Sequence, residues 1–229
     1  MLPKIGFKPD IIHCNDWHTG LMGVFLREDF CHDDFYKDIK VIYTIHNLKY
    51  QGIYPPTIMR DIIGLPQELF DNGSLECDGC VNYMKSGMVY ADYITTVSQT
   101  YAREITYPYY GERLDGYIRS CMDKLIGISN GLDEDVYNPA TDTYIKQRYT
   151  SAHARGGKRV NKDALRRELG LPVKRSIPLI AIVSRLVEDK GMDLVTCIMA
   201  VLEEVDVQSS MLRTRQAADN TALSRLDPT

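Results

Sequence analysis

The sequence of 229 residues predicts an α/β protein built on parallel β-sheet. Five short apolar runs rich in β-branched residues predict buried parallel strands, and segments with helical periodicity separate them. Strands that alternate with helices are typical of βαβ units. Each run also ends on a polar residue, and α/β proteins bind their ligands beyond the carboxyl ends of such strands.

The elements follow one another in a regular order. Strands are predicted over 11–16, 41–47, 93–98, 125–130 and 180–185. Helices are predicted over 18–28, 81–91, 100–105, 115–122, 161–169 and 191–205. Asn161 is a candidate N-cap for its helix, which Gly170 and Pro172 end. The residues of the last helix predicted to face inward are Leu194, Ile198, Val201 and Leu202.

Two segments depart from this order. Residues 135–158 are rich in turn-forming residues, and the stretch from Ala154 to Lys158 is predicted to be flexible and basic. A domain junction is therefore predicted near Asn130. After Gln208 the chain turns polar and shows no strand pattern, so residues 209–229 are predicted not to continue the fold.

Composition narrows the classes of function. The net charge is −4 and no basic stretch stands out, so a nucleic-acid partner is not expected. No apolar run approaches the ~20 residues of a membrane span, and the first residues lack the apolar core of a signal peptide. The six scattered cysteines are typical of reduced thiols in a cytoplasmic protein.

Cys77 and Cys80 form a CxxC pair that we interpret as incidental. A zinc site needs four ligands, and no second pair follows at usable spacing. A redox pair would open a helix directly after a strand, whereas a loop precedes this one. No metal is predicted.

Arg185 and Lys190 follow the last predicted strand and precede a helix. The free N–H groups and macrodipole of a helix N-terminus favour anions, and two nearby cations could complete a clamp for a diphosphate. The alternative is a solvated arginine and lysine in an ordinary βα loop.

Asp16, Trp17, His46 and Asn47 follow the first two strands. The carboxylate and the aromatic side chain suit sugar recognition, and the imidazole could bind a hydroxyl or assist proton transfer. The alternatives are an N-cap role for Asp16, because a helix follows, and a structural role for His46. Asn130 could line a cleft at the domain junction or simply belong to a turn.

Five segments, taken together, resemble bacterial glycogen synthase and plant starch synthase, in the same order and spacing. They lie within residues 8–21, 44–52, 91–98, 130–142 and 183–191, and include the Asn-Asp-Trp-His, His-Asn and Ser-Arg-Leu sequences quoted above. The resemblance extends from about residue 8 to residue 208 and is specific because all five occur together.

This resemblance implies a GT-B fold, in which two Rossmann-like domains face a cleft. Residues 1–129 would form the later part of the N-terminal domain, and residues 130–208 the start of the C-terminal one. The implied reaction transfers glucose from ADP-glucose to the non-reducing end of an α-1,4-glucan with retention of configuration. It needs neither a metal nor a cofactor.

The resemblance also assigns roles to residues. Arg185 and Lys190 would hold the donor diphosphate and stabilise the charge that grows on the leaving group. Asn130 would lie near the same diphosphate, and His46 would contact the glucose ring. Asp16, Trp17 and Asn47 would line the side of the site that holds the donor sugar and the acceptor.

The chain departs from the family pattern in ways that matter. The family's Lys-x-Gly-Gly-Leu loop and the later glutamate-bearing motif have no counterpart here. We therefore expect a fragment with negligible synthase turnover by itself, and a frameshifted reading is one hypothesis for 209–229.

Other functions remain open. They are a non-catalytic glucan- or nucleotide-binding remnant and a related sucrose- or trehalose-type synthase. A dinucleotide-dependent oxidoreductase is disfavoured because the chain has no Gly-x-Gly-x-x-Gly.

Overall fold

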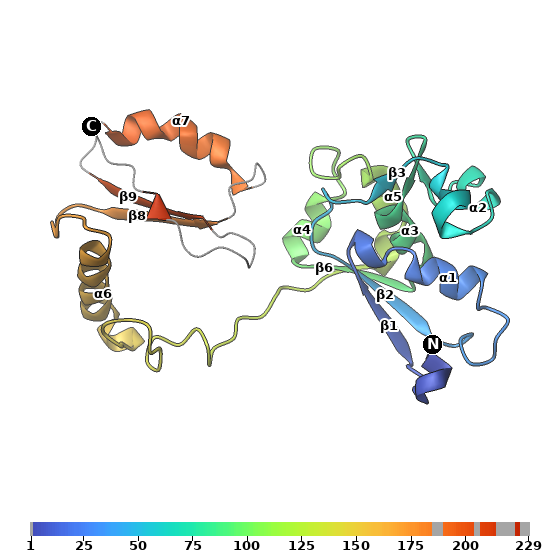
Figure 1. Ribbon diagram of the computed structural model, residues 1–229, viewed down its shortest axis with the longest axis horizontal. Coiled ribbons are helices and arrows are strands. Elements are labelled where there is room, and N and C mark those ends of the chain that lie inside the picture. The colour runs from blue at the N-terminus through green and yellow to red at the C-terminus, as the bar shows by residue number, and fades with distance from the viewer. Residues whose placement is uncertain (1, 185–189, 204–206, 214–222, 225–229) are drawn as a thin grey trace. The chain divides into compact units, whose positions relative to one another are not determined.

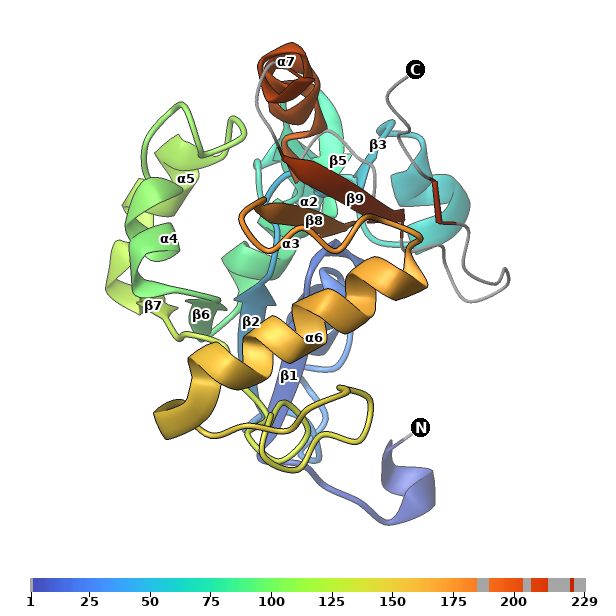
Figure 2. The same cartoon turned by 90° about the vertical axis from the view of Figure 1, so that its left-hand side faces the viewer.

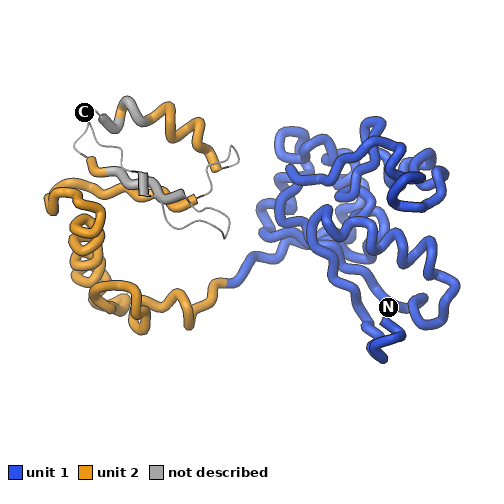
Figure 3. Tube along the Cα trace, viewed as in Figure 1, with its two compact units in different colours: residues 1–131 blue, residues 132–229 orange. Residues whose placement is uncertain are grey.

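A computed structural model describes residues 2–184, 190–203, 207–213 and 223–224. The chain divides into two compact units, Met1–Gly131 and Leu132–Thr229, which Figure 3 distinguishes by colour. Each unit combines helices with its own sheet, so the predicted α/β class is confirmed. The assignment of residues 1–129 and 130–208 to two family domains stays a prediction.

The central sheet of the first unit has four parallel strands in the order β1-β2-β6-β7. The strands are β1 (Ile11–Asn15), β2 (Lys40–Ile45), β6 (Tyr93–Thr96) and β7 (Leu125–Gly127). Each coincides with a predicted strand but ends before the polar residue that closes the run. Those polar residues therefore lie just beyond the carboxyl edge of the sheet.

Helices cover one face of this sheet. The helices of the first unit are α1 (Met22–Glu28), α2 (Glu68–Asp71), α3 (Tyr83–Tyr90), α4 (Gln99–Glu104) and α5 (Asp115–Ser120), of which α2 packs on the small sheet described below. In Figures 1 and 2, α3, α4 and α5 lie on the same side of the strands. Tyr43, Ile45 and Ile94 are buried beneath them. Ile11 and Tyr93 point to the other face and are more than half exposed, so the prediction of buried strands holds for one face only.

Asp92 ties strands and helix together at the opposite, amino edge of the sheet. Its carboxylate accepts a hydrogen bond from the backbone N–H of Val41 at 2.8 Å and pairs with Arg27 at 2.9 Å. Burial acts to raise the pKa of Asp92, but these two partners and Lys40 outweigh it and lower the pKa overall. This edge is thus held by structural ion pairs.

A small antiparallel sheet in the order β3-β5-β4 was not predicted. Its strands are β3 (Ile53–Tyr54), β4 (Glu76–Cys77) and β5 (Cys80–Asn82). Asp78 and Gly79 both have positive φ, which is typical of a type I′ hairpin turn. Cys77 and Cys80 therefore face each other across the hairpin as free thiols.

The second unit holds a three-stranded sheet in the order β10-β9-β8 with a helix on either side (Figures 1 and 2). Its elements are α6 (Ala154–Glu168), β8 (Leu179–Ser184), α7 (Met192–Glu203), β9 (Gln208–Arg213) and β10 (Leu223–Ser224). The pair β8 and β9 is parallel, whereas β10 runs antiparallel to β9. Short helical turns elsewhere in the chain cover Leu2–Ile5, Trp17–Thr19, Met59–Ile63, Met122–Lys124 and Ser151–His153.

Two predictions for this unit were wrong. Helix α6 begins at Ala154, so the stretch expected to be flexible is helical and Asn161 lies inside the helix rather than at its cap. Strand β9 occupies 208–213, where no strand was predicted. Strand β9 is held by its backbone pairing with β8 and needs no apolar pattern. At its start, the side-chain oxygen of Gln208 accepts a hydrogen bond from Nε of Arg166 at 2.6 Å.

The apolar side of α7 also differs from expectation. Leu194, Ile198 and Val201 were predicted to face inward, yet each is at least half exposed. The helix itself was predicted correctly. Among the described residues, however, no element packs against the side that carries these apolar residues.

Candidate functional site

The candidate site lies at the carboxyl edge of the four-stranded sheet, where β1 and β2 end side by side. Asn15 is the last residue of β1 and pairs with Thr44 of β2, so Asp16 and His46 follow at neighbouring positions. This juxtaposition follows from the parallel register, because residues that leave adjacent parallel strands emerge at the same edge.

Asp16 has a strained backbone. Its φ of 55° and ψ of −178° place a non-glycine residue in a region that essentially only glycine adopts. Hydrogen bonds hold this conformation: the Asp16 N–H donates to the carbonyl of Thr44 at 2.9 Å, and its own carbonyl accepts from the N–H of Thr19 at 3.2 Å. Strain of this kind clusters at ligand-binding and catalytic positions.

The carboxylate of Asp16 is directed at the neighbouring strand end. Its Oδ1 accepts a hydrogen bond from the backbone N–H of His46 at 2.8 Å. Asp16 does occupy the N-cap position of the turn Trp17–Thr19, as predicted, but its side chain makes no capping bond there. Asp16 therefore fixes where the chain leaves β2 and so where the histidine sits.

The imidazole of His46 is exposed and is oriented by a residue that sequence reasoning missed. Oδ1 of Asn15 lies 2.9 Å from Nε2 of His46, and because an amide oxygen only accepts, this contact favours the tautomer that carries its proton on Nε2. Nδ1 is then left as the acceptor of the ring. The position of Asn15, directly before Asp16 at a strand end, is the only signal in the sequence that could have indicated it.

Trp17 is packed rather than free-standing. Its ring stacks on His18 with centroids 4.0 Å apart, and Tyr54 and Tyr83 approach from the small sheet and α3. Gly52, at φ +63°, lies so close that a Cβ there would be 2.4 Å from Cε3 of Trp17. The site thus has an aromatic wall whose position depends on a glycine.

Asn47 and the residues after it form an anchored turn. Oδ1 of Asn47 accepts from the N–H of Lys49 at 3.0 Å, and the N–H of Leu48 donates to the hydroxyl of Tyr101 at 3.1 Å. Further along, Gln51 accepts from the Asn82 amide at 2.6 Å. The loop that presents His46 is therefore supported by α4 and by the start of α3.

The other predicted residues lie elsewhere. Asn130 is exposed, beyond β7 at the same edge of the sheet. Lys190 belongs to the second unit, where it is exposed ahead of α7 and adjoins Gly191, which has φ +68°. Arg185 lies outside the described residues. The structure thus brings Asp16, Trp17, His46 and Asn47 together, and the proposed diphosphate clamp stays a prediction.

The described residues contain no cluster of three or more His, Cys, Asp or Glu side chains arranged to hold a metal ion. Nor does the described part of the chain contain a helix long and apolar enough to cross a membrane.

Residues 1–120 match the family described as the starch synthase catalytic domain. The chain belongs to this family. A structure of the same family, the catalytic domain of starch synthase IV from Arabidopsis thaliana bound to ADP and acarbose, matches with a TM-score of 0.81 and 31% sequence identity. That match covers 92% of this chain and 43% of the other, and it supports the GT-B fold implied by the resemblance.

Bacterial members of the starch synthase family are more similar in sequence. The glycogen synthase of Geobacillus stearothermophilus is 47% identical over 214 residues, which are 93% of this chain and 44% of the relative. The glycogen synthase of Lachnospira eligens is 51% identical over 213 residues, which are 93% of this chain and 45% of the relative. The chain therefore spans less than half the length of these relatives.

Proposed function

We propose that this chain is part of a retaining glucosyltransferase that transfers glucose from ADP-glucose to the non-reducing end of an α-1,4-glucan. The observation that carries the proposal is the Asp16–His46 pair at the carboxyl edge of the sheet, in a chain of the starch synthase family. Relatives named glycogen synthase and a related structure bound to ADP and acarbose support these substrates.

Each residue of the site contributes a distinct interaction in this proposal. His46 contacts a hydroxyl of the transferred glucose, and Asp16 and Asn15 hold its backbone and ring in place. Trp17 and Asn47 line the sugar side. Preorganisation of this kind matters because the groups need not reorganise as the glycosidic bond to the diphosphate breaks.

The leaving group is a nucleoside diphosphate, and its departure needs positive charge. Arg185 and Lys190 supply that charge in the proposal, with Asn130 near the same phosphates. The guanidinium and ammonium groups stabilise the charge that develops on the leaving oxygen, so the reaction requires neither a metal ion nor a cofactor. A cytoplasmic location is part of the proposal, supported by six cysteines that are all free thiols.

A chimaera tests this function. The 214-residue stretch of the Geobacillus stearothermophilus glycogen synthase that aligns with this chain is replaced by the present sequence. We expect incorporation of radiolabelled glucose from ADP-glucose into glycogen, in linkages that an α-specific glucosidase releases, and much less incorporation from UDP-glucose. Faster transfer from UDP-glucose, or to a free monosaccharide acceptor, would instead favour a sucrose- or trehalose-type synthase.

Calorimetry on the 229-residue chain complements the chimaera. Titration with ADP and with maltoheptaose measures whether this part of the protein binds either ligand. Binding together with an inactive chimaera would favour a non-catalytic binding function over the transferase.

A further inference from the structure

Helix α6 carries a dense band of positive charge. Residues 146–175 contain ten Lys and Arg but only two acidic residues, Asp163 and Glu168, in a chain whose net charge is −4. The band lies on successive turns, at Arg155, Lys158, Arg159 and Lys162. This spacing of three and four residues puts the four side chains on one side of the helix. Arg155 and Lys158 were predicted to lie in a flexible segment, so the sequence did not indicate that these cations share a helix.

This arrangement destabilises the helix unless an anion offsets it. Cations three or four residues apart on a helix repel each other. Among the described residues, none of the four cations of the band forms an ion pair or hydrogen bond. The described part of the protein therefore does not itself neutralise the band.

The helix that bears the band is held in place by packing and hydrogen bonds on more than one side. Asn161 exchanges two hydrogen bonds with the backbone of Gln147, at 2.7 and 2.8 Å. Gly157 packs so closely on Tyr149 that a Cβ there would be 2.5 Å from its side chain. Arg166 is fully buried and donates to the carbonyl of Ile177. These contacts hold the backbone of α6, from which the cations project, in place within the second unit.

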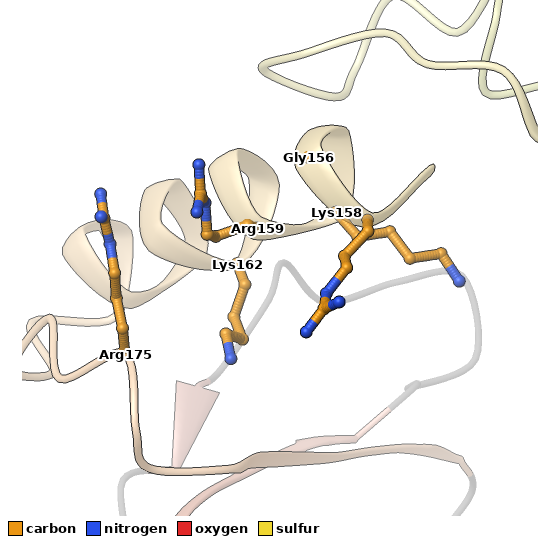
Figure 4. Close-up of a pocket in the computed structure, with 6 residues that line it drawn as sticks. Gly156, Lys158, Arg159, Lys162 and Arg175 are labelled. Carbon is orange, nitrogen blue, oxygen red and sulfur yellow. The ribbon is translucent and has the colours of Figure 1, made fainter. Parts of the chain in front are cut away.

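These cations line a cavity of about 620 Å³ together with Gly156 and Arg175. Arg175 comes from the loop after the helix, where Nε lies 3.2 Å from Oδ2 of the buried Asp163. The four side chains leave the same side of the helix and then diverge: in Figure 4, Arg159 extends in the same direction as Arg175, and Lys162 in the opposite direction. A fan of separate donors suits several anionic groups in a row better than one phosphate.

We propose that this cavity, lined by Arg155, Lys158, Arg159, Lys162 and Arg175, binds a linear oligophosphate. Guanidinium and ammonium groups are the usual partners of phosphate oxygens, and the band offers one cation for each successive phosphate. All the described lining residues are Arg, Lys or Gly, so the described part of the cavity provides no aromatic surface on which a base could stack. The site goes beyond the proposed transferase function, because it shares no residue with the predicted glucan and ADP-glucose sites.

Calorimetry with sodium tripolyphosphate tests the proposal on the 229-residue chain. We expect saturable binding in 150 mM NaCl, weaker binding of orthophosphate, and a dissociation constant that rises with added salt. The double variant Arg159→Gln/Lys162→Gln should bind tripolyphosphate about tenfold more weakly or worse, since two charge-assisted contacts are lost. Glutamine is a good helix former, so α6 should persist, as circular dichroism can verify.

A matched control separates the cavity from general charge. Arg167→Gln/Lys174→Gln removes the same two charges from exposed positions nearby that do not line the cavity, and should leave binding within about twofold. An equal loss of tripolyphosphate affinity in the two double variants, or no saturable binding of tripolyphosphate by the wild-type chain, would overturn the proposal. So would tighter binding of an oligouridylate than of tripolyphosphate.

Two further measurements keep the result independent of the variants and of the transferase. In the wild-type chain, tripolyphosphate should shift the backbone amide NMR signals of residues 155–162 more than those of the first unit, and the opposite pattern would contradict the site. The Arg159→Gln/Lys162→Gln variant should bind ADP with the same dissociation constant as the wild type, because the predicted donor site includes neither residue. A large loss of ADP affinity would mean that the band belongs to the donor site instead.

Discussion

Oδ1 of Asp16 accepts a hydrogen bond from the backbone N–H of His46 at 2.8 Å, joining the carboxyl ends of two adjacent strands. The bond is made by a residue whose own φ is +55°. A strained residue therefore sets the position of the histidine that we propose contacts the glucose ring. The site is built where the chain leaves two adjacent strands at the sheet edge.

Substitution of Asp16 separates its strain from its hydrogen bond. Asp16→Ala loses the carboxylate and keeps the strain, whereas Asp16→Gly loses the carboxylate but relaxes the backbone. We expect Asp16→Ala to lower the free energy of unfolding by about 2 kcal/mol and Asp16→Gly by about 1 kcal/mol less. Urea denaturation measures both, and an alanine variant as stable as the glycine variant would contradict the strain.

The amide of Asn15 should set the tautomer of His46. In the wild-type chain the Nε2-protonated form should dominate, because Oδ1 of Asn15 accepts from it. In Asn15→Leu that acceptor is gone, and both tautomers should be populated. Nitrogen-15 NMR at a pH where the ring is neutral reads the tautomer directly. The exposed His32 serves as the internal reference and should not change.

Gly52 should be indispensable to the position of Trp17. Alanine there must adopt φ +63° and meets the indole at 2.4 Å, whereas alanine at Gly64 has a similar φ of +74° but nothing within 4 Å. We expect Gly52→Ala to destabilise the fold by about 2 kcal/mol more than Gly64→Ala, because overpacking adds to the backbone cost. The chain has a single tryptophan, so a shifted emission maximum in Gly52→Ala alone would report its displacement. Equal behaviour of the two variants would contradict the contact.

The Tyr90–Glu28 contact should make part of the stability fall in alkali. Burial, followed by the hydrogen bond to Glu28, raises the pKa of Tyr90 to about 12. An unfolded tyrosine has a pKa of about 10. The contribution of the Tyr90 hydroxyl to the free energy of unfolding is therefore complete below pH 10 and is lost as the pH rises through 12. Tyr90→Phe should therefore show a shallower decline of stability over this interval than the wild type. Tyr109→Phe, at a site 86% exposed, should follow the wild type.

Much of the first unit could be predicted from sequence, because its signals are local. The runs that became β1, β2, β6 and β7 are apolar, short and bounded by turn residues, so the strands and their parallel pairing followed. The hairpin of β4 and β5 was missed although its signal is local, because Asp78-Gly79 is a dipeptide that favours a type I′ turn.

The second unit was predicted less well for physical reasons. Gly156 and Gly157 suggested flexibility, yet Gly157 is helical because only a glycine lets α6 approach Tyr149. Strand β9 lacks an apolar pattern, and its start depends on the long-range bond between Gln208 and Arg166. Contacts of this kind are set by tertiary structure and leave no periodicity in the sequence.

In the candidate site, too, some features could be predicted from the sequence and others depend on tertiary packing. Asp16 and His46 could be placed together because parallel strands end at one edge, and the structure confirms that they lie together. The strain at Asp16, the orienting role of Asn15 and the dependence of Trp17 on Gly52 are properties of packing. They became visible only once the strand ends and the small sheet were placed in three dimensions.

The proposed transferase function is tested most directly by the rate of glucose transfer in the chimaera with His46→Ala, compared with His32→Ala. Loss of a group that contacts the transferred sugar should lower kcat/KM by about a hundredfold, whereas loss of the exposed His32 should leave it unchanged. A His46→Ala chimaera as active as the His32→Ala chimaera would contradict the placement of the sugar site at this sheet edge.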